Sequence, residues 1–200
     1  MVTATPTAKI DIQTLVQAHL GDPRNADPTT KITAGTLWAD KPAVVLVLRR
    51  PGCVLCRAEA LKLWELKDQI EGLGANLVCV VHEWRDREVA AFAPEYWAGP
   101  VYHDLDKVFY KALNGGEVLK GSSLGLLNPL SDVWKRIMAA RKLVPDHNLV
   151  GEGLIMGGLM VLGAGTTGAT FVHIESDLGV HADHADVLSA ILEAVALGQK

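Results

Sequence analysis

Apolar residues run without interruption in two short blocks, and each block predicts a strand that is buried on both faces. The first block covers 43–48 and the second 77–81, and both are rich in β-branched residues. Continuous apolar runs of this kind are typical of strands inside a parallel sheet. Between them, apolar residues recur at helical spacing over 57–73, and glycines follow as a stop signal. The pattern therefore predicts a β-α-β unit.

The same alternation continues toward the C-terminus. In order, the patterning predicts a helix at 84–93, a strand at 99–103, a helix at 105–113, strands at 154–162 and 170–174, and a helix at 183–198. A glycine-rich turn joins the two late strands, so we expect them to pair antiparallel. This order of elements indicates an α/β protein with a thioredoxin-like fold, in which helices flank a central mixed sheet.

A helical insertion, about 117–149, precedes the last two strands. Its amphipathic helix is expected over 129–142, with Asn128 as the N-cap and Pro129 at the first helical position. We expect this helix to cover an apolar pocket beside the two cysteines described below. If apolar area around Trp134 is instead exposed, helix 129–142 becomes a docking surface for a protein partner.

Composition places the chain among soluble globular proteins. It has 200 residues, of which 49% are hydrophobic and 21% charged, enough for one domain over 31–200 after an N-terminal arm or short helix over 1–30. The formal net charge of −4 argues against nucleic acid and against an anionic membrane as partners. The N-terminus lacks the apolar core of a secretory signal, and three cysteines are too few for a disulfide framework. The cytoplasm is the expected location.

Cys53 and Cys56 stand where the first apolar block gives way to helical spacing. A thiol at the first turn of a helix feels the positive end of the macrodipole and unpaired backbone N–H groups. Both favour the thiolate, so we expect the pKa of Cys53 to lie below the free value of about 8.5. In a β-α context, the Cys-x-x-Cys spacing is typical of a redox dithiol, with Cys53 attacking and Cys56 resolving. Two inert core thiols are the alternative without chemistry.

A zinc site is a further alternative, because Cys79-x-x-His82 supplies a second pair of ligands at zinc-ribbon spacing. Geometry disfavours it, since residues three apart on one strand face opposite sides of the sheet. Cys79 lies in the middle of an apolar run and is interpreted as a small buried hydrophobe. His82 and His103 each follow a predicted strand and are interpreted as loop histidines whose hydrogen bonds are satisfied, with proton transfer as the alternative.

Three arginines, Arg49, Arg50 and Arg57, surround the two cysteines in sequence. Arg57 opposes the macrodipole of its own helix, but beside a thiolate the same charge lowers the pKa of the sulfur and can hold a peroxide oxygen. Arg50 is the preferred functional residue, because it ends the buried strand just before the thiol. Ordinary surface arginines are the alternative.

Two further patterns suggest ligands but have simpler explanations. The spacing Gly163-x-Gly165-x-x-Gly168 matches a dinucleotide fingerprint, but it leads into a strand rather than a helix and is better explained as a hairpin turn. Histidines and acids near the last helix resemble a metal cluster, but they fit acidic residues at a helix start with neighbouring surface histidines: His181, Asp183, His184 and Asp186. No bound cofactor or metal is expected.

The segments 49–57 (RRPGCVLCR) and 151–165 (GEGLIMGGLMVLGAG) resemble the peroxiredoxin-like AhpC/TSA family. That family includes the redox-regulatory protein of activated macrophages and prostamide/prostaglandin F synthase. The resemblance covers roughly 36–195. It implies a thioredoxin-like fold with Cys53 and Cys56 as the functional dithiol. True peroxiredoxins carry Thr-x-x-Cys ahead of the reactive sulfur, and here Arg50 occupies the threonine position.

What the resemblance implies is a thiol-dependent oxidoreductase that reduces a peroxide or endoperoxide, with a lipid-like peroxide as one candidate substrate. Thioredoxin, reduced with electrons from NADPH, would regenerate the dithiol. The alternative is a non-catalytic thioredoxin-fold redox sensor or interaction scaffold, which helix 129–142 and the N-terminal arm would connect to a partner.

Overall fold

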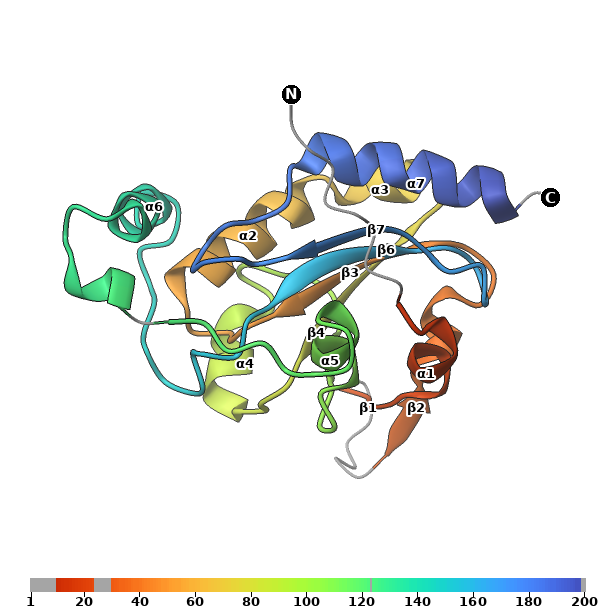
Figure 1. Ribbon diagram of the computed structural model, residues 1–200, viewed down its shortest axis with the longest axis horizontal. Coiled ribbons are helices and arrows are strands. Elements are labelled where there is room, and N and C mark those ends of the chain that lie inside the picture. The colour runs from red at the N-terminus through yellow and green to blue at the C-terminus, as the bar shows by residue number, and fades with distance from the viewer. Residues whose placement is uncertain (1–9, 24–29, 123, 199–200) are drawn as a thin grey trace.

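A computed structural model describes residues 10–23, 30–122 and 124–198. Within them, the strands form one seven-stranded mixed sheet in the order β2-β1-β5-β4-β3-β6-β7 (Figure 1). The strands are β1 (His19–Gly21), β2 (Lys31–Thr33), β3 (Ala43–Leu48), β4 (Asn76–Val81), β5 (Val101–His103), β6 (Gly158–Leu162) and β7 (Ala169–Ile174). β3, β4 and β5 run parallel, whereas β6 and β7 pair antiparallel at one edge. This confirms the mixed sheet expected from the sequence.

Helices cover both faces of the sheet (Figure 1). They are α1 (Ile12–Gln17), α2 (Val54–Glu65), α3 (Lys67–Gly72), α4 (Asp86–Phe92), α5 (Val108–Leu113), α6 (Asp132–Ala140) and α7 (His184–Gly198), with 3-10 turns η1 (Ala34–Trp38) and η2 (Leu124–Leu127). One core cluster joins the sheet to α2, α3 and α7, and a second joins it to α1 and α5. Because β3 contributes to both clusters, all of its residues are buried and apolar.

The helix predicted over 57–73 differs from the observed one at its start and in its middle. It begins at Val54, with Cys53 as an extended N-cap residue, and it breaks at Leu66, whose ψ of 2° is not helical. The earlier start means that Cys56 lies inside the first turn of α2 rather than ahead of the helix. Apolar periodicity marks the face of a helix that is buried, but it does not mark the cap that begins it.

The insertion helix also starts later than predicted. Ser131 caps α6 by accepting a hydrogen bond from the Trp134 N–H, whereas Asn128 accepts one from the Leu130 N–H two residues on. The expected N-cap at Asn128 was therefore wrong, because its side chain forms a local turn instead. β6 is likewise shorter than the predicted strand, since residues 154–157 lie outside it and only Ile155 forms an isolated bridge with Lys120.

The N-terminal segment contains the short helix α1 and then strand β1, which pairs with β5. Leu15 and Leu20 are fully buried in the second core cluster. The rest of the expected arm, residues 1–9 and 24–29, lies outside the described residues. Among the described helices, none is both long enough and apolar enough to span a bilayer.

Candidate active site

The two cysteines sit together at the start of α2. Cys53 is the N-cap residue, and its carbonyl accepts the first helical hydrogen bond, from the Arg57 N–H at 2.9 Å. Cys56 follows within the first turn, so its thiol lies on the same side of the helix as that of Cys53. Both side chains are buried and unoxidised. The expected placement of the dithiol at a strand-to-helix junction is what the structure shows.

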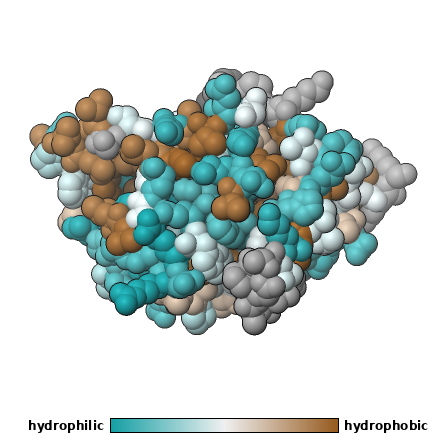
Figure 2. All heavy atoms as spheres, turned by 90° about the horizontal axis from the view of Figure 1, so that it is seen from below, coloured by the Kyte–Doolittle hydropathy of each residue, from teal (hydrophilic) through white to brown (hydrophobic). Residues whose placement is uncertain are grey.

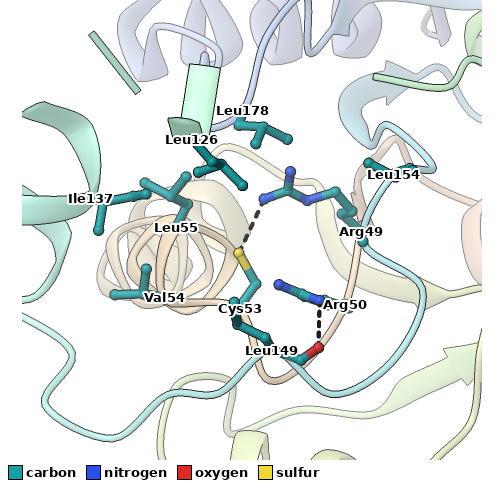
Figure 3. Close-up of a pocket in the computed structure, with 11 residues that line it drawn as sticks. Arg49, Arg50, Cys53, Val54, Leu55, Leu126, Ile137, Leu149, Leu154 and Leu178 are labelled. Carbon is teal, nitrogen blue, oxygen red and sulfur yellow. Dashed lines mark hydrogen bonds between the residues drawn. The ribbon is translucent and has the colours of Figure 1, made fainter. Parts of the chain in front are cut away.

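One guanidinium contacts both sulfurs. Nη2 of Arg49 donates to Sγ of Cys53 at 3.0 Å (Figure 3). The same nitrogen lies 3.7 Å from Sγ of Cys56. Arg49 is only 3% exposed, so little water screens its charge. Burial would lower the pKa of Arg49, but the two thiols and Glu175 raise it well above the ordinary value. Arg49 therefore stays a cation at every accessible pH.

The surroundings shift the pKa values of the two thiols in opposite directions. A hydrogen bond from the Cys56 thiol lowers the pKa of Cys53 well below the ordinary value, overcoming burial, and the charges of Arg49 and Arg50 lower it further. The same hydrogen bond, together with burial and the charge on Cys53, raises the pKa of Cys56 well above its ordinary value. The surroundings therefore favour the thiolate at Cys53 and the protonated thiol at Cys56.

The other two arginines of this corner have different contacts. Nη1 of Arg50 donates to the carbonyls of Leu149 at 2.9 Å and Gly151 at 3.3 Å, while its charge still acts on Cys53 (Figure 3). Arg57 is fully buried, and its guanidinium donates to the carbonyls of Pro51 and Asp146. Arg50 thus lies at the thiol corner, as expected, whereas Arg57 ties the loop before α2 to the insertion.

A pocket of about 280 Å³ opens beside Cys53. Its walls are formed by the arginines, Cys53 and a set of apolar side chains: Val54, Leu55, Leu126, Ile137, Leu149, Leu154 and Leu178 (Figure 3). Ile137 comes from α6 and Leu126 from η2, so the insertion helix does cover the pocket. Cys53 is 4% exposed, and this opening is where the residue meets solvent space.

The remaining candidates fall outside this corner. Cys79 is fully buried, and burial raises the pKa of its thiol well above the ordinary value, as expected of an inert core thiol. His82 is also buried, where its ring meets Tyr110 edge-on with the centroids 4.9 Å apart. Cys79 belongs to the first core cluster and Tyr110 to the second. The two faces expected from the strand geometry are confirmed, and the proposed zinc pair does not converge.

The glycine-rich motif is a turn between β6 and β7, as its context predicts, and the Gly163 N–H donates to the Gly168 carbonyl at 2.7 Å. The histidines near α7, in contrast, are not surface residues. His181 and His184 both approach the buried carboxylate of Glu59. Asp183 accepts a hydrogen bond from the Ala185 N–H, which is the expected helix-start role. Among the described residues, no three metal-ligating side chains converge on one point.

Sequence reasoning missed two residues of this corner. Arg49 was recognised as a neighbour of the cysteines, but its contact with both sulfurs was not predicted. The available signal was its place directly after six buried residues of β3, where a cation needs a buried partner. Glu175 was not considered, because it lies 119 or more residues from the dithiol in sequence and only the pairing of β6 with β7 and β3 brings it close.

Comparison with known proteins identifies the family. Residues 62–177 match a family model described as AhpC/TSA antioxidant enzyme. Peroxiredoxin-like 2A of Rattus norvegicus is 41% identical over 162 residues, which cover 81% of this chain and 66% of that protein. Peroxiredoxin-like 2A of Danio rerio is 33% identical over 195 residues, covering 96% of this chain and 86% of that one. The chain belongs to the peroxiredoxin-like AhpC/TSA family.

Solved structures agree on the fold. PrxQ from Xylella fastidiosa superposes with a TM-score of 0.61 at 15% identity, over 96% of this chain and 99% of that one. The peroxidoxin BcpB from Mycobacterium tuberculosis gives a TM-score of 0.58 at 18% identity, over 94% and 98% of the two chains. At these identities, the likeness establishes the thioredoxin-like peroxiredoxin fold alone.

The description of the matched family model, antioxidant enzyme, is a property of that family. The chain spans 66% of the length of the rat relative, and the family match begins after Cys53 and Cys56. The roles of the individual thiols therefore follow from the geometry of this chain.

Proposed function

We propose that this protein is a thiol peroxidase in which Cys53 attacks an apolar hydroperoxide or endoperoxide and Cys56 resolves the product. One observation carries the proposal: a sulfur with a depressed pKa, held by a buried guanidinium at 3.0 Å, faces an apolar pocket. A thiolate is the reactive form of cysteine, and pockets lined by apolar side chains select apolar ligands.

In the first step, the Cys53 thiolate attacks one oxygen of the O–O bond. The S–O bond forms and the O–O bond breaks, so a hydroperoxide yields a Cys53 sulfenic acid and an alkoxide, which takes up one proton as the alcohol. Arg49 and Arg50 both line the pocket beside Cys53, and either guanidinium can donate hydrogen bonds to the oxygen that gains negative charge. These donors replace the hydroxyl of the threonine found in other peroxiredoxins.

In the second step, Cys56 gives up its proton and attacks the sulfur of Cys53. With a sulfenic acid the leaving group is hydroxide, which takes that proton and departs as water, so a Cys53–Cys56 disulfide remains. With an endoperoxide the first step leaves an alkoxy group on Cys53 sulfur, and the same attack releases it as the second alcohol. An external dithiol of the thioredoxin type then reduces the disulfide and restores both thiols, a cycle suited to the cytoplasm.

The apolar side chains that line the pocket support an apolar substrate. Leu126, Leu149 and Leu154 are apolar and partly exposed, so a ligand that covers them removes apolar area from water. Each buried methylene contributes about 0.8 kcal/mol. Hydrogen peroxide has no apolar part and gains nothing from these walls. We therefore propose lipid-like hydroperoxides or endoperoxides as substrates.

The test is a coupled assay with thioredoxin, thioredoxin reductase and NADPH, to which hydrogen peroxide, cumene hydroperoxide or a prostaglandin endoperoxide is added. Catalytic NADPH consumption that is fastest with an apolar peroxide supports the proposal. Cys53→Ser should abolish turnover. Cys56→Ser should leave oxidised Cys53 without its internal resolving thiol, so that a thioredoxin variant lacking its own second cysteine is trapped as a mixed disulfide with Cys53. Cys79→Ala is the matched control, because it removes a thiol that lies fully buried outside the site.

A second candidate function, the redox sensor or scaffold, has its own supporting observation. The insertion exposes a group of large apolar side chains at one end of the molecule, Leu124, Leu127, Leu130 and Met138 (Figure 2). Met138 belongs to α6, and Leu130 lies just before α6, within the helix predicted over 129–142. Exposed apolar patches mark contact surfaces, so this helix suits a protein partner. Stoichiometric oxidation of Cys53 without turnover in the coupled assay would favour the sensor over the enzyme.

A further inference from the structure

Four titratable side chains, two buried carboxylates and two half-buried histidines, form a series that runs from the thiol corner to the start of α7. Glu175 directly follows β7, and its Oε1 lies 3.7 Å from Nε2 of His181. On the other side of the ring, Nδ1 of His181 lies 3.1 Å from Oε2 of Glu59, which belongs to α2. The remaining oxygen of Glu59 lies 3.0 Å from Nε2 of His184. The two carboxylates are almost completely buried, so water does little to stabilise their charges.

Arg49 connects this series to the sulfurs. It donates to Cys53 on one side, and on the other it lies close enough to Glu175 for each charge to shift the pKa of its partner. In the described part of the structure, Nε of Arg49 and Oε2 of Glu175 are both buried without a hydrogen-bond partner. The two groups therefore interact through their charges rather than through a fixed hydrogen bond.

Counting charges shows what the histidines have to do. With Cys53 and Glu175 both ionised, the set contains three negative groups, the thiolate, Glu59 and Glu175, against the buried cation Arg49, to which Arg50 adds its charge at Cys53. Burial raises the pKa of Glu175, whereas the charges of Arg49 and His181 lower it, so its ionised form depends on those cations. Buried charges persist only when opposite charges balance them. The two histidines can supply that balance when both are protonated. Closing a Cys53–Cys56 disulfide removes one negative charge, and the set then holds one proton too many.

Other polar groups near the series are already engaged. Arg136 of α6 pairs with Asp177 at 2.6 Å, and His173 of β7 lies 2.8 Å from the Val180 carbonyl. Lys62 of α2 lines the same surface groove as His181 and carries the same sign of charge as a protonated imidazole. The proton balance of the thiol corner therefore depends on the two histidines that touch Glu59.

We propose that His181, held between Glu59 and Glu175, is a positioning residue of the thiol site that carries a proton while Cys53 is a thiolate and releases it when the disulfide forms. The inference rests on the proposed function only in requiring that Cys53 and Cys56 can form a disulfide, and it requires no particular peroxide. Oxidation of one thiolate and one thiol by hydrogen peroxide yields a disulfide and two waters only if one further proton is supplied. His181 supplies it.

The charges around His181 also favour its protonated form. Burial would lower the pKa of His181, but the hydrogen bond with Glu59 and the charges of Glu59, Glu175 and Cys53 raise it above the ordinary value. Coupling between two sites is reciprocal. If the Cys53 thiolate raises the pKa of His181, then protonated His181 lowers the pKa of Cys53 by the same free energy. Glu175 acts in the opposite direction on Cys53.

The direct test is an NMR titration of the histidine rings in the reduced protein and in the protein oxidised with diamide. Diamide oxidises a dithiol to a disulfide by accepting two electrons and two protons. We expect the proton affinity of His181 to fall about tenfold, one pKa unit, on oxidation. His19, an exposed histidine of β1, which β5 and β4 separate from β3, is the control ring, and its signal should not change with the redox state. Equal titration of His181 in both states would overturn the inference.

Variants give a second readout on the thiol itself. Measured by the pH dependence of Cys53 alkylation, His181→Asn should raise the pKa of Cys53, Glu175→Gln should lower it, and His19→Asn should leave it unchanged. If the two residues had only a structural role, their variants would not shift the pKa of Cys53 in opposite directions. If the pKa of His181 falls on oxidation but no peroxide is turned over, the proposed enzyme activity is wrong and the role of His181 still holds. Failure of diamide to join Cys53 to Cys56 would overturn both.

Discussion

Replacing Arg49 by methionine tests the electrostatic basis of the thiol site. Methionine keeps a long, buried, largely apolar side chain and removes the guanidinium that donates to Cys53 at 3.0 Å. Coulomb's law at the same 3.0 Å separation gives about 5 kcal/mol with an effective dielectric constant of about 20. Desolvation of the two charges offsets much of this attraction. An opposite charge at short range typically lowers a pKa by about 1–3 units, or about 1.4–4 kcal/mol.

We therefore expect Arg49→Met to raise the pKa of Cys53 by about 1–3 units. The thiolate absorbs near 240 nm, so a pH titration of that absorbance reports the shift directly, and the rate of alkylation at acidic pH should fall in parallel. Cys56→Ser serves as the background in both titrations, because it leaves only Cys53 to ionise in this range, with Cys79 buried.

Arg50→Met is the matched control. Its guanidinium is engaged with the carbonyls of Leu149 and Gly151, so its removal should shift the pKa of Cys53 less than removal of Arg49 does. An unchanged pKa of Cys53 in Arg49→Met, or a larger shift in Arg50→Met, would contradict the role of Arg49. In the second case, the residue preferred from the sequence would be the one that activates the sulfur.

Three further predictions concern stability and selectivity. His181 and His184 depress the pKa of Glu59 to about 2 against the penalty of burial, so the stabilisation from its charge is present above the unfolded pKa of about 4.5 and lost as pH falls toward 2. Urea unfolding of Glu59→Gln should show a loss of about 1–3 kcal/mol at pH 6 that nearly vanishes near pH 2; a loss of equal size at both pH values would contradict the assignment. Arg57→Met should destabilise by about 2–4 kcal/mol, because the buried Pro51 carbonyl and the partly buried Asp146 carbonyl lose their donor. Asp146→Asn, which removes only an exposed charge, should cost less than about 1 kcal/mol; comparable losses in the two unfolding curves would argue against the hydrogen bonds as the cause. Leu126→Asn should lower kcat/KM for cumene hydroperoxide about tenfold and leave hydrogen peroxide nearly unchanged, with Leu127→Asn, outside the pocket, as the control; a uniform drop for both peroxides would remove the apolar wall from the argument.

The order of strands and helices was predictable because the central strands are apolar on both faces. The block that became β3 is buried throughout, and the block that became β4 pairs with it in parallel register. A continuous apolar run between polar segments has few other uses in a soluble domain. The position of Cys53 and Cys56 followed from the same pattern, because it depends only on where a strand ends and a helix begins.

The partners of the thiols were not predictable in the same way. Arg49 and Arg50 are adjacent in sequence, and only the direction in which the chain leaves β3 decides which guanidinium reaches sulfur. Glu59 and His181 meet because α2 and the segment before α7 lie on the same face of the sheet. Contacts of this kind depend on tertiary geometry over more than a hundred residues, which local periodicity does not encode.

The shared guanidinium has a consequence for the speed of the redox cycle. Because Arg49 reaches both sulfurs at once, Cys53 and Cys56 are already neighbours within one helical turn. Two thiols that start far apart can form a disulfide only after the backbone that carries them moves. Here α2 can keep its helical structure, so the circular dichroism spectra of the reduced and oxidised protein should coincide. The rate of turnover is then limited by how fast the peroxide and the reductant reach Cys53 through the pocket opening.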